Sequence, residues 1–348
     1  MNSCPSVSRL KEFAQALLVA AGLDVEKARA VAVTLLEGDL LGHTTHGLSL
    51  LPAYLAELEK GSMEKIGEPD VIADFPAAVT WDGRRLPGPW LVERAIQLAT
   101  ERSKRLGTCT VVIRCSHHIG CLEAFLRPVT EQGLMVLITC SDPAAAMVAP
   151  HGGRRGVITP NPLAAGWPTR GEPVLVDVSM STTSFANVKR LYAEKRLAPG
   201  RWFVTADGEA TADPAALFSV PPGALLPTGG VDHGHKGYAL GLWVEALSSG
   251  LSGYGRADGA KGWTANVFVQ VLDPRLFAGQ ENFLRETTHL ADACRATQPQ
   301  PGVSKVRLPG EAALRKRRQQ STDGVDLHPT ILPALKSWAE KYNVAPPW

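Results

Sequence analysis

Gly234-His235-Lys236-Gly237-Tyr238 is the stretch of this sequence that best restricts the fold and the function. It places an imidazole and an ammonium group between two glycines, directly before the apolar run 239–247. Apolar residues recur at helical spacing in that run, which predicts a helix over 238–251. A cation and small residues at the start of a helix suit an anionic ligand, because unpaired N–H groups and the helix dipole attract negative charge. The stretch predicts an anion site, and a glycine-bounded turn is the alternative.

A second segment, Gly42-His43-Thr44-Thr45-His46-Gly47, contains two histidines three residues apart. The hydroxyl of Thr45 can orient the imidazole of His46, and Gly47 gives a substrate access to the backbone. Histidine titrates near neutral pH, which suits proton donation to a developing alkoxide or amine. The pattern predicts that His46 is an acid/base residue and that His43 is a hydrogen-bonded residue at a helix end.

Three further sites follow predicted strands. Ser116-His117-His118-Ile119-Gly120 comes after the strand 109–113, where side chains commonly build sites, and the alternative is one inward and one outward histidine. Asp177 ends the strand 174–178 and needs hydrogen-bond partners. It could orient a histidine, bind a cofactor or cap the strand. Arg307-Leu308-Pro309-Gly310-Glu311 is expected to end a strand and begin a helix, a corner that suits phosphate.

The composition excludes several classes of protein. The net charge is only +2, with 36 basic and 34 acidic residues, which argues against a nucleic-acid partner. The basic run Arg315-Lys316-Arg317-Arg318 is interpreted as a solvated helix face. No stretch approaches the ~20 apolar residues that span a bilayer, so no membrane partner is expected. The six cysteines lack C-x-x-C spacing, which fits reduced thiols in a cytoplasmic protein.

Helices and strands mix along the chain without a steady βαβ alternation, which does not support a doubly wound parallel sheet. Both G-x-G-x-x-G and G-x-x-x-x-G-K-[ST] are absent, so any nucleotide must be held by a different fold. Helices are expected at 8–21, 25–41, 51–58, 89–105, 121–131, 238–251, 281–297, 312–320 and 328–342; strands at 78–82, 109–113, 134–139, 174–178 and 265–272, with another within 298–308.

Six segments, taken in order, resemble motifs of the malate/L-lactate dehydrogenase family that lacks a Rossmann fold. Its members include ureidoglycolate dehydrogenase, sulfolactate dehydrogenase, 2,3-diketogulonate reductase and Δ1-piperideine-2-carboxylate reductase. The matching segments are Gly42–Gly47 with Pro52 and Tyr54, Pro150–Gly153 with Asn161-Pro162, Val176–Ser179, Ala206–Gly208 with Thr211–Pro214, Gly234–Tyr238, and Arg307–Glu311. Together they extend over nearly the whole chain.

The resemblance implies an α/β (α+β-like) fold with a mixed, largely antiparallel sheet and flanking helices. It implies a cytoplasmic homodimer that transfers hydride between NAD(P)H and C2 of a small 2-oxo or 2-hydroxy acid. The two expected units are a helical domain, 1–75 with 312–348, and a cofactor-binding α/β domain, 76–311, with the active site at their junction. No metal ligand is implied, and the choice between NAD and NADP stays open.

Residue roles follow from the same resemblance. His46 is the expected proton donor and acceptor, with Thr45 in place of the family serine. His118 matches a histidine with the acid/base role in the ureidoglycolate branch, and Asp177 completes the expected catalytic set. The implied substrate positions are Asn161 and Leu50. The implied cofactor-binding residues are Ser141, Val176, Asp177, Val178, Ser179, His235, Lys236, Pro309, Gly310 and Glu311.

Three departures from the family pattern bear on specificity. Leu50 stands where relatives have an arginine, a natural partner for a substrate carboxylate. The loop Thr159-Pro160-Asn161-Pro162 replaces a glycine-led segment, and Cys140 replaces an asparagine before Ser141. The sequence leaves three alternatives. One is a reductase of cyclic imino acids, in which a protonated C=N bond needs less help from an acid. The others are a histidine-based metallohydrolase and a non-catalytic binding protein that binds the cofactor without turnover.

Overall fold

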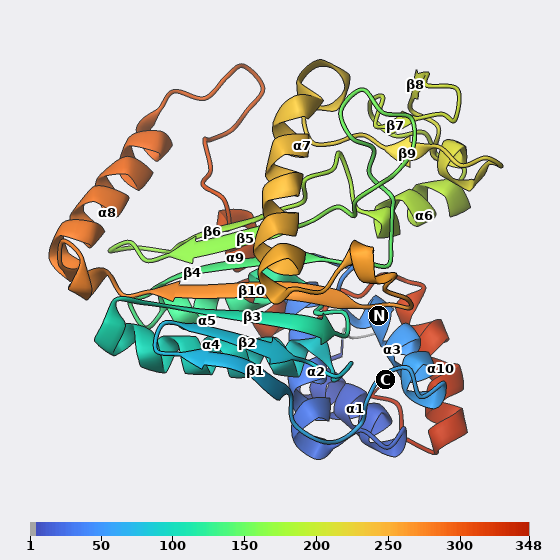
Figure 1. The fold of residues 1–348 in the computed structure, drawn as a ribbon, viewed down its shortest axis with the longest axis horizontal. Helices are drawn as coiled ribbons and strands as arrows, with labels where there is room; N and C mark the ends of the chain where they lie inside the picture. Colours follow the sequence, from blue (N-terminus) through green and yellow to red (C-terminus); the bar gives the residue numbers. More distant parts are fainter. Residues whose placement is uncertain (1–4, 348) are drawn as a thin grey trace.

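The computed structural model describes residues 5–347, and its centre is a seven-stranded sheet in the order β1-β2-β3-β10-β4-β5-β6 (Figure 1). The pairing is antiparallel throughout this sheet except between β2 and β3. This confirms the predicted mixed, largely antiparallel sheet. The strands are β1 (Asp70–Phe75), β2 (Ala78–Asp82), β3 (Thr108–Ser116), β4 (Met135–Ser141), β5 (Leu163–Trp167), β6 (Val174–Val178) and β10 (Ala265–Leu272).

Strand β10 lies between β3 and β4, and most of its side chains are buried. Its alternate residues Val267, Val269 and Val271 are fully buried. They belong to one hydrophobic cluster with residues of α4 (Gly88–Leu106) and α5 (Arg127–Thr130), two helices that pack against the sheet. The alternation of buried side chains is the pattern expected of a strand with a packed face.

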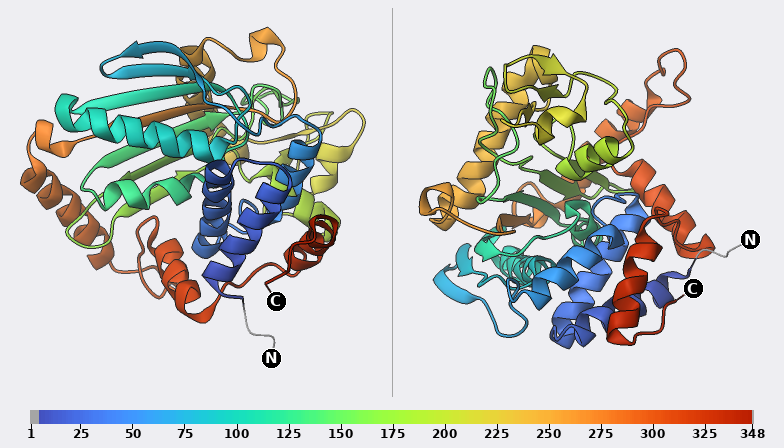
Figure 2. Two further views of the ribbon diagram at one scale, coloured as in Figure 1. Left: turned by 90° about the horizontal axis from the view of Figure 1, so that it is seen from below. Right: turned by 90° about the vertical axis from the view of Figure 1, so that its right-hand side faces the viewer.

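A second hydrophobic cluster joins the two ends of the chain. Its N-terminal helices are α1 (Val7–Ala20), α2 (Val25–Leu41) and α3 (Leu51–Glu59), and α10 (Ile331–Tyr342) lies beside them (Figure 2). The division into a helical domain, 1–75 with 312–348, and an α/β domain, 76–311, stays a prediction. Strand β1 precedes residue 76 but pairs with β2 in the main sheet.

A small sheet in the order β8-β7-β9 builds a third packing unit above the main sheet (Figure 1). Its strands are β7 (Phe203–Val204), β8 (Ala210–Thr211) and β9 (Ala224–Leu225), and α6 (Phe185–Ala193) packs beside them through Val188 and Leu191. The remaining helices are α7 (Gly230–Glu245), α8 (Gln280–Ala296) and α9 (Glu311–Asp323). Within residues 5–347, no helix is both long enough and apolar enough to cross a membrane.

The prediction that a helix begins at residue 238 is wrong. Helix α7 begins at Gly230, and its helical geometry breaks at His233. The stretch Gly234–Tyr238 therefore forms the first turn after the break. Gly237 allows close packing here, because a β-carbon would lie 2.5 Å from the carbonyl oxygen of Thr228. Tertiary packing therefore outweighs the low helix propensity of glycine.

Two other elements differ from the predictions. The expected helix 121–131 is a 3₁₀ turn, Leu122–Phe125, followed by the single turn of α5. No strand forms within 298–308, because only one bond, from Leu175 N–H to the carbonyl of Pro309 at 3.3 Å, joins the neighbouring segment to the sheet edge at β6. Strands β1 and β5 and helix α6 were not predicted.

Candidate functional site

His46 lies in the loop that joins α2 to α3. Gly42 ends α2 in the left-handed conformation, with φ 95°, and so turns the chain into this loop. The hydroxyl of Thr45 lies 3.0 Å from Nδ1 of His46. Thr45 therefore holds the imidazole as its adjacent position predicts, and when Nδ1–H of neutral His46 donates to this hydroxyl, Nε2 carries the lone pair that can accept a proton.

His118 comes to the same place from the end of β3. Its ring stacks on that of His46, with centroids 6.2 Å apart and an interplanar angle of 23°. Nδ1 of His118 accepts the N–H of Gly120 at 3.2 Å and lies 3.0 Å from the hydroxyl of Tyr54, which donates to the carbonyl of His118 at 2.8 Å. Because Nδ1 accepts, Nε2 of neutral His118 holds the proton.

Both histidines are neutral at pH 7. Burial, together with the charge of nearby His43, lowers the pKa of His46 to about 4, although the residue is only half-buried. Burial also lowers the pKa of His118 well below its usual value, with smaller contributions from His46 and His117. Neutral imidazoles can accept a proton directly, and each must first be charged to donate one.

His117 has a different environment from His118. Its side chain is fully buried, and its ring lies edge-on to Tyr54 and Trp263 at centroid distances of 5.6 and 5.2 Å. Its Nε2 lies 3.5 Å from a carboxylate oxygen of Glu57. The pair therefore divides as one buried structural histidine and one histidine that contacts His46.

Asp177 belongs to a neighbouring network. Its carboxylate accepts the backbone N–H of Glu123 at 2.9 Å and the thiol of Cys121 at 3.9 Å. His43 lies 2.6 Å from the Glu123 carboxylate, which confirms its prediction as a hydrogen-bonded residue at a helix end. Among the described residues, Asp177 makes no hydrogen bond to His46 or His118, so it does not orient either one directly.

His43, Cys121 and Asp177 place ligand-type atoms within 4.8 Å of one another. Two of these atoms are already engaged, because Nε2 of His43 meets Glu123 and the Asp177 carboxylate accepts a backbone N–H. Burial raises the pKa of Asp177, whereas the charge on His43 opposes that rise. This group contains a single histidine, which differs from the histidine-based metal site of the metallohydrolase alternative.

The expected cofactor segments on β6 and before α9 lie against each other. Besides the bond between Leu175 and Pro309, Gly310 packs so closely that a β-carbon would lie 2.8 Å from Cβ of Leu175. Gly310 has φ 87° and caps α9, which also makes glycine necessary there. This brings Val176, Asp177, Val178 and Ser179 near Pro309, Gly310 and Glu311.

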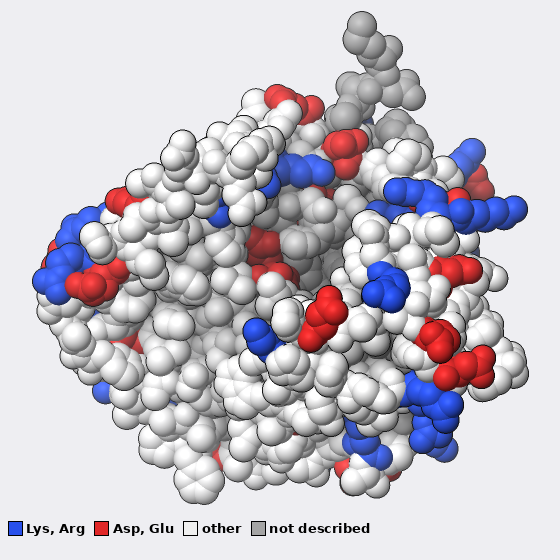
Figure 3. All heavy atoms as spheres, turned by 90° about the horizontal axis from the view of Figure 1, so that it is seen from above, with Lys and Arg blue, Asp and Glu red and all other residues white. Residues whose placement is uncertain are grey.

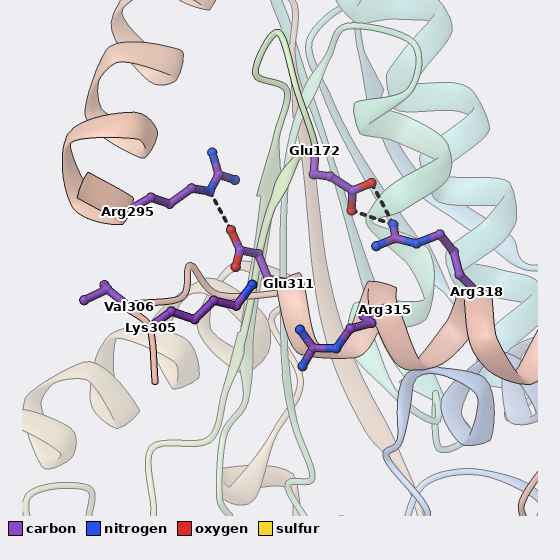
Figure 4. A pocket seen from close by; sticks show the side chains of 7 residues that line it. All are labelled: Glu172, Arg295, Lys305, Val306, Glu311, Arg315 and Arg318. Atoms are coloured by element: carbon purple, nitrogen blue, oxygen red, sulfur yellow. Dashed lines mark hydrogen bonds and ion pairs between the residues drawn. The ribbon is translucent and has the colours of Figure 1, made fainter. Parts of the chain in front are cut away.

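Charged side chains surround this junction. The upper face of the molecule is hollowed, with acidic side chains on the wall of the hollow and basic side chains near its rim (Figure 3). A cleft of about 510 Å³ lies at the start of α9, lined by Glu172, Arg295, Lys305, Val306, Glu311, Arg315 and Arg318 (Figure 4).

Two ion pairs cross the walls of this cleft and leave two cations without a partner. Glu311 pairs with Arg295 at 2.6 Å, and Glu172 pairs with Arg318 at 2.7 Å. Lys305 and Arg315 form no ion pair with any described residue. These cations and the N-terminus of α9 suit the phosphates of a nucleotide.

Two expected site residues are not available to a ligand in this structure. Asn161 is fully buried, and its amide donates to the carbonyl of Gly241 at 3.0 Å and to Glu245 at 3.1 Å. Ser141 is also fully buried, and its hydroxyl contacts that of Ser248 at 2.8 Å. The expected substrate role of Asn161 and the expected cofactor role of Ser141 are therefore not supported by this geometry.

His235 and Lys236 are exposed on α7, where they can reach solvent but have no hydrogen bond among the described residues. Leu50 is partly buried and packs against the second hydrophobic cluster, the helical cluster formed by α1, α2, α3 and α10. Tyr54 and Trp263 were given no role from sequence. Their ring contacts with His118, at 6.0 and 4.6 Å, depend on segments that are distant in the chain, and a single sequence contains no signal for them.

The fold and these groups define an enzyme whose site contains histidines and whose nucleotide-binding fold is not a Rossmann fold. The chain belongs to the malate/L-lactate dehydrogenase family, whose family model matches residues 6–336. This family comprises NAD(P)-dependent 2-hydroxy acid dehydrogenases together with reductases of cyclic imino acids. The assignment supports an oxidoreductase rather than the metallohydrolase that the sequence left as an alternative.

Two curated relatives and one solved structure illustrate the similarity. The chain is 35% identical to L-lactate dehydrogenase of Cupriavidus necator, over 98% of this chain and 99% of the relative. It is 30% identical to Delta(1)-pyrroline-2-carboxylate/Delta(1)-piperideine-2-carboxylate reductase of Pseudomonas syringae pv. tomato, over 96% of each. The crystal structure of malate dehydrogenase from Entamoeba histolytica superposes with a TM-score of 0.93 at 25% identity, over 99% of each chain.

Proposed function

We propose that this protein is an NAD(P)H-dependent oxidoreductase that interconverts a small 2-oxo monocarboxylate and its 2-hydroxy acid. The observation that supports this proposal is the imidazole of His46, held by Thr45 at 3.0 Å and stacked on His118. The Cupriavidus necator relative is an L-lactate dehydrogenase, which favours a small monocarboxylate.

His46 is the residue that exchanges the proton. In oxidation, neutral His46 accepts the hydroxyl proton on Nε2, and in reduction the protonated ring returns it to the carbonyl oxygen. The nicotinamide, when bound, supplies or receives the hydride at C2. His118 and the Trp263 ring border the same space and align the substrate.

The cofactor would be held at the junction of β6 and α9. Asp177 and the neighbouring backbone of β6 lie on one side, and the α9 N-terminus with Lys305 and Arg315 lies on the other. The two unpaired cations would contact the phosphates, and exposed Lys236 on α7 offers a further cation. The fit rests on this donor set and on Gly310, which lacks a side chain and so lets Leu175 of β6 pack against the start of α9.

Reduction of a cyclic imino acid is a second candidate activity. The low pKa of His46, about 4, favours it, because a protonated C=N bond accepts hydride without needing an imidazolium donor. The Pseudomonas syringae relative is a Delta(1)-pyrroline-2-carboxylate/Delta(1)-piperideine-2-carboxylate reductase.

We also propose a cytoplasmic homodimer. Leu240, Leu242 and Trp243 are 44–47% exposed on α7, which suits an apolar face that a second copy covers. Five described cysteines, Cys109, Cys115, Cys121, Cys140 and Cys294, are free, which fits a reducing compartment, and Cys4 lies outside the described residues.

One experiment tests the catalytic proposal. Purified protein is assayed by nicotinamide absorbance against a panel of 2-oxo acids, 2-hydroxy acids and cyclic imino acids, with NADH, NADPH and their oxidised forms. We expect turnover of a small 2-oxo monocarboxylate, or of a cyclic imino acid under the second candidate. The absence of turnover with every pair, in protein that binds the cofactor, would refute both.

A further inference from the structure

We infer that Arg190, which reaches the site from helix α6, binds the carboxylate of the substrate. This inference rests on the proposed function and adds a specificity residue to it. It concerns an element that neither the sequence patterns nor the expected site residues included.

Helix α6 holds Arg190 firmly. Ser184 caps the helix by accepting the N–H of Asn187 at 3.2 Å. Val188 and Leu191 anchor the helix in the hydrophobic cluster beside the small sheet. Arg190 itself is half-buried and extends away from these anchors. Its guanidinium contacts Thr44, a residue 146 positions away that lies two residues before His46.

The contact leaves the guanidinium available to an anion. Both terminal nitrogens of Arg190 face the same atom, Oγ1 of Thr44, at 3.4 and 3.5 Å. These are long contacts to a neutral oxygen, so a carboxylate can replace Thr44 at the same pair of N–H groups and form a shorter bidentate bond. Among residues 5–347, no carboxylate forms an ion pair with Arg190.

The site otherwise lacks an unpaired positive charge for a carboxylate, because the charge on His43 is matched by Glu123, 2.6 Å away. Position 50 is an apolar side chain packed on the helical cluster, and His46 and His118 are neutral. Lys316 also approaches the loop, since its Cδ lies 3.1 Å from the position that a β-carbon on Gly42 would take, but its charge acts on the buried carboxyl of Asp39. A half-buried guanidinium beside the acid/base loop supplies the missing charge from a different element.

The geometry also indicates the substrate class. A single guanidinium compensates one carboxylate, so a substrate with one carboxylate beside C2 fits better than a dicarboxylate. Held by Arg190, such a substrate would lie along the loop 44–46, next to the Thr44 hydroxyl and the His46 ring.

Two substitutions and a matched control test the inference. Arg190→Gln removes the charge but keeps a polar side chain, and Arg190→Lys keeps the charge but loses the bidentate edge. Lys189→Gln is the control, because Lys189 is the exposed neighbour on α6 and its ammonium group lies 5.1 Å from the centre of the Phe185 ring. Circular dichroism confirms that each variant is folded.

The readouts compare a carboxylate with its neutral amide. For the best 2-oxo acid of the panel, Arg190→Gln should lower kcat/KM roughly 10- to 100-fold, mainly through KM, because a charged hydrogen-bond partner is lost. The corresponding amide should change less than about threefold, Arg190→Lys should be intermediate and Lys189→Gln should resemble wild type. Calorimetric titration of oxamate, with and without reduced cofactor, should show the same order of affinities, whereas neutral oxamide should bind all variants equally weakly.

The outcomes separate this inference from the proposed function. Turnover of a 2-oxo acid with an unchanged preference of Arg190→Gln for carboxylate over amide would overturn the role of Arg190 alone. Wild-type protein without turnover, in which oxamate affinity still depends on Arg190, would refute the proposed reaction and keep the carboxylate site. Equal oxamate binding by wild type and Arg190→Gln, or no binding to either, would also overturn the inference.

Discussion

The carboxyl group of Asp39 fills the space that a side chain at Gly47 would need. A β-carbon on Gly47 would lie 2.3 Å from Cγ of Asp39 and 2.4 Å from both carboxyl oxygens. One of these oxygens accepts the N–H of Leu48 at 2.7 Å. Gly47 is therefore needed for packing between α2 and the loop of His46, a reason other than the substrate access that the sequence suggested.

Gly47→Ala should displace the loop and lower both stability and turnover. Overpacking of this kind costs about 1–3 kcal/mol, so we expect a lower midpoint of thermal unfolding together with reduced kcat. Gly171→Ala is the control, because a β-carbon there would meet only Oγ1 of Thr169, at 3.8 Å. Equal stability and activity of the two variants would show that the Asp39 contact does not position the loop.

Asp39 should make the protein less stable as the pH rises from about 4 to 7. Burial raises its pKa from 3.8 to about 7, against the opposing effects of the Leu48 hydrogen bond and Lys316. In this window the folded state binds more protons than the unfolded state, so the free energy of unfolding decreases with pH, by a few kcal/mol in all. The fall is complete once the pH passes the pKa of the folded state.

Asp39→Asn removes the titrating group and keeps an oxygen for Leu48 N–H. Denaturant unfolding between pH 4 and 8 should give a clearly flatter profile for this variant than for wild type. An identical slope in both proteins would assign the pH dependence to other groups.

His46→Ala should lower turnover by about 10²–10⁴-fold, the usual contribution of general acid/base catalysis. Cofactor affinity should stay nearly unchanged, because the expected cofactor residues lie on β6 and at α9. His118→Ala should act more on apparent substrate affinity, since its ring borders the site and its Nδ1 is engaged by Gly120. Pre-steady-state hydride transfer measures both, and a larger loss of hydride transfer in His118→Ala would exchange the two roles.

The pH dependence of the rate should differ between the two directions. With the pKa of His46 near 4, oxidation requires the neutral ring and its kcat/KM should be constant above about pH 5. Reduction of a carbonyl requires the protonated ring, so its kcat/KM should fall about tenfold per pH unit above that value. Reduction of a protonated cyclic imine should lack this fall up to the pKa of the imine. An inflection at pH 6–7 that disappears in His46→Ala would contradict the low pKa.

Local patterns in the sequence predict much of the fold. The bounds 78–82, 174–178 and 265–272 coincide with β2, β6 and β10, because each is a short apolar or alternating run between clear breaks. Helix α7 begins earlier than predicted, since its glycines pack against residues distant in sequence. Strand β1 has largely exposed side chains, with Val71 61% and Phe75 66% exposed. Because neither face of this strand is buried, its sequence lacks the apolar alternation that would have predicted it.

The site divides in the same way. The contact between Thr45 and His46 joins adjacent residues and follows from their order in the chain. The hydrogen-bond partners of Asp177 and the burial of Asn161 depend on how β6 and α7 pack against the rest of the fold. The approach of Arg190 to Thr44 joins α6 to a loop 146 residues earlier, and a single sequence gives no indication of such a pair.

Leu50→Arg tests how the site recognises charge. Wild type, with an apolar residue at position 50, should use malate poorly, because a second carboxylate would meet no second cation. Leu50 lies at the edge of the helical cluster and is only partly buried, so an arginine there can extend its charged end out of the apolar contacts. We expect Leu50→Arg to raise kcat/KM for a 2-oxo dicarboxylate relative to the best monocarboxylate by at least about tenfold, the value of one charge-assisted hydrogen bond.

In the double variant Leu50→Arg with Arg190→Gln, part of the lost monocarboxylate activity should return, because position 50 then supplies the only added cation. Leu50→Gln, which is polar but uncharged, is the control for packing changes. Efficient use of malate by wild type, or an equal response to Leu50→Arg and Leu50→Gln, would mean that charge at position 50 does not set substrate choice.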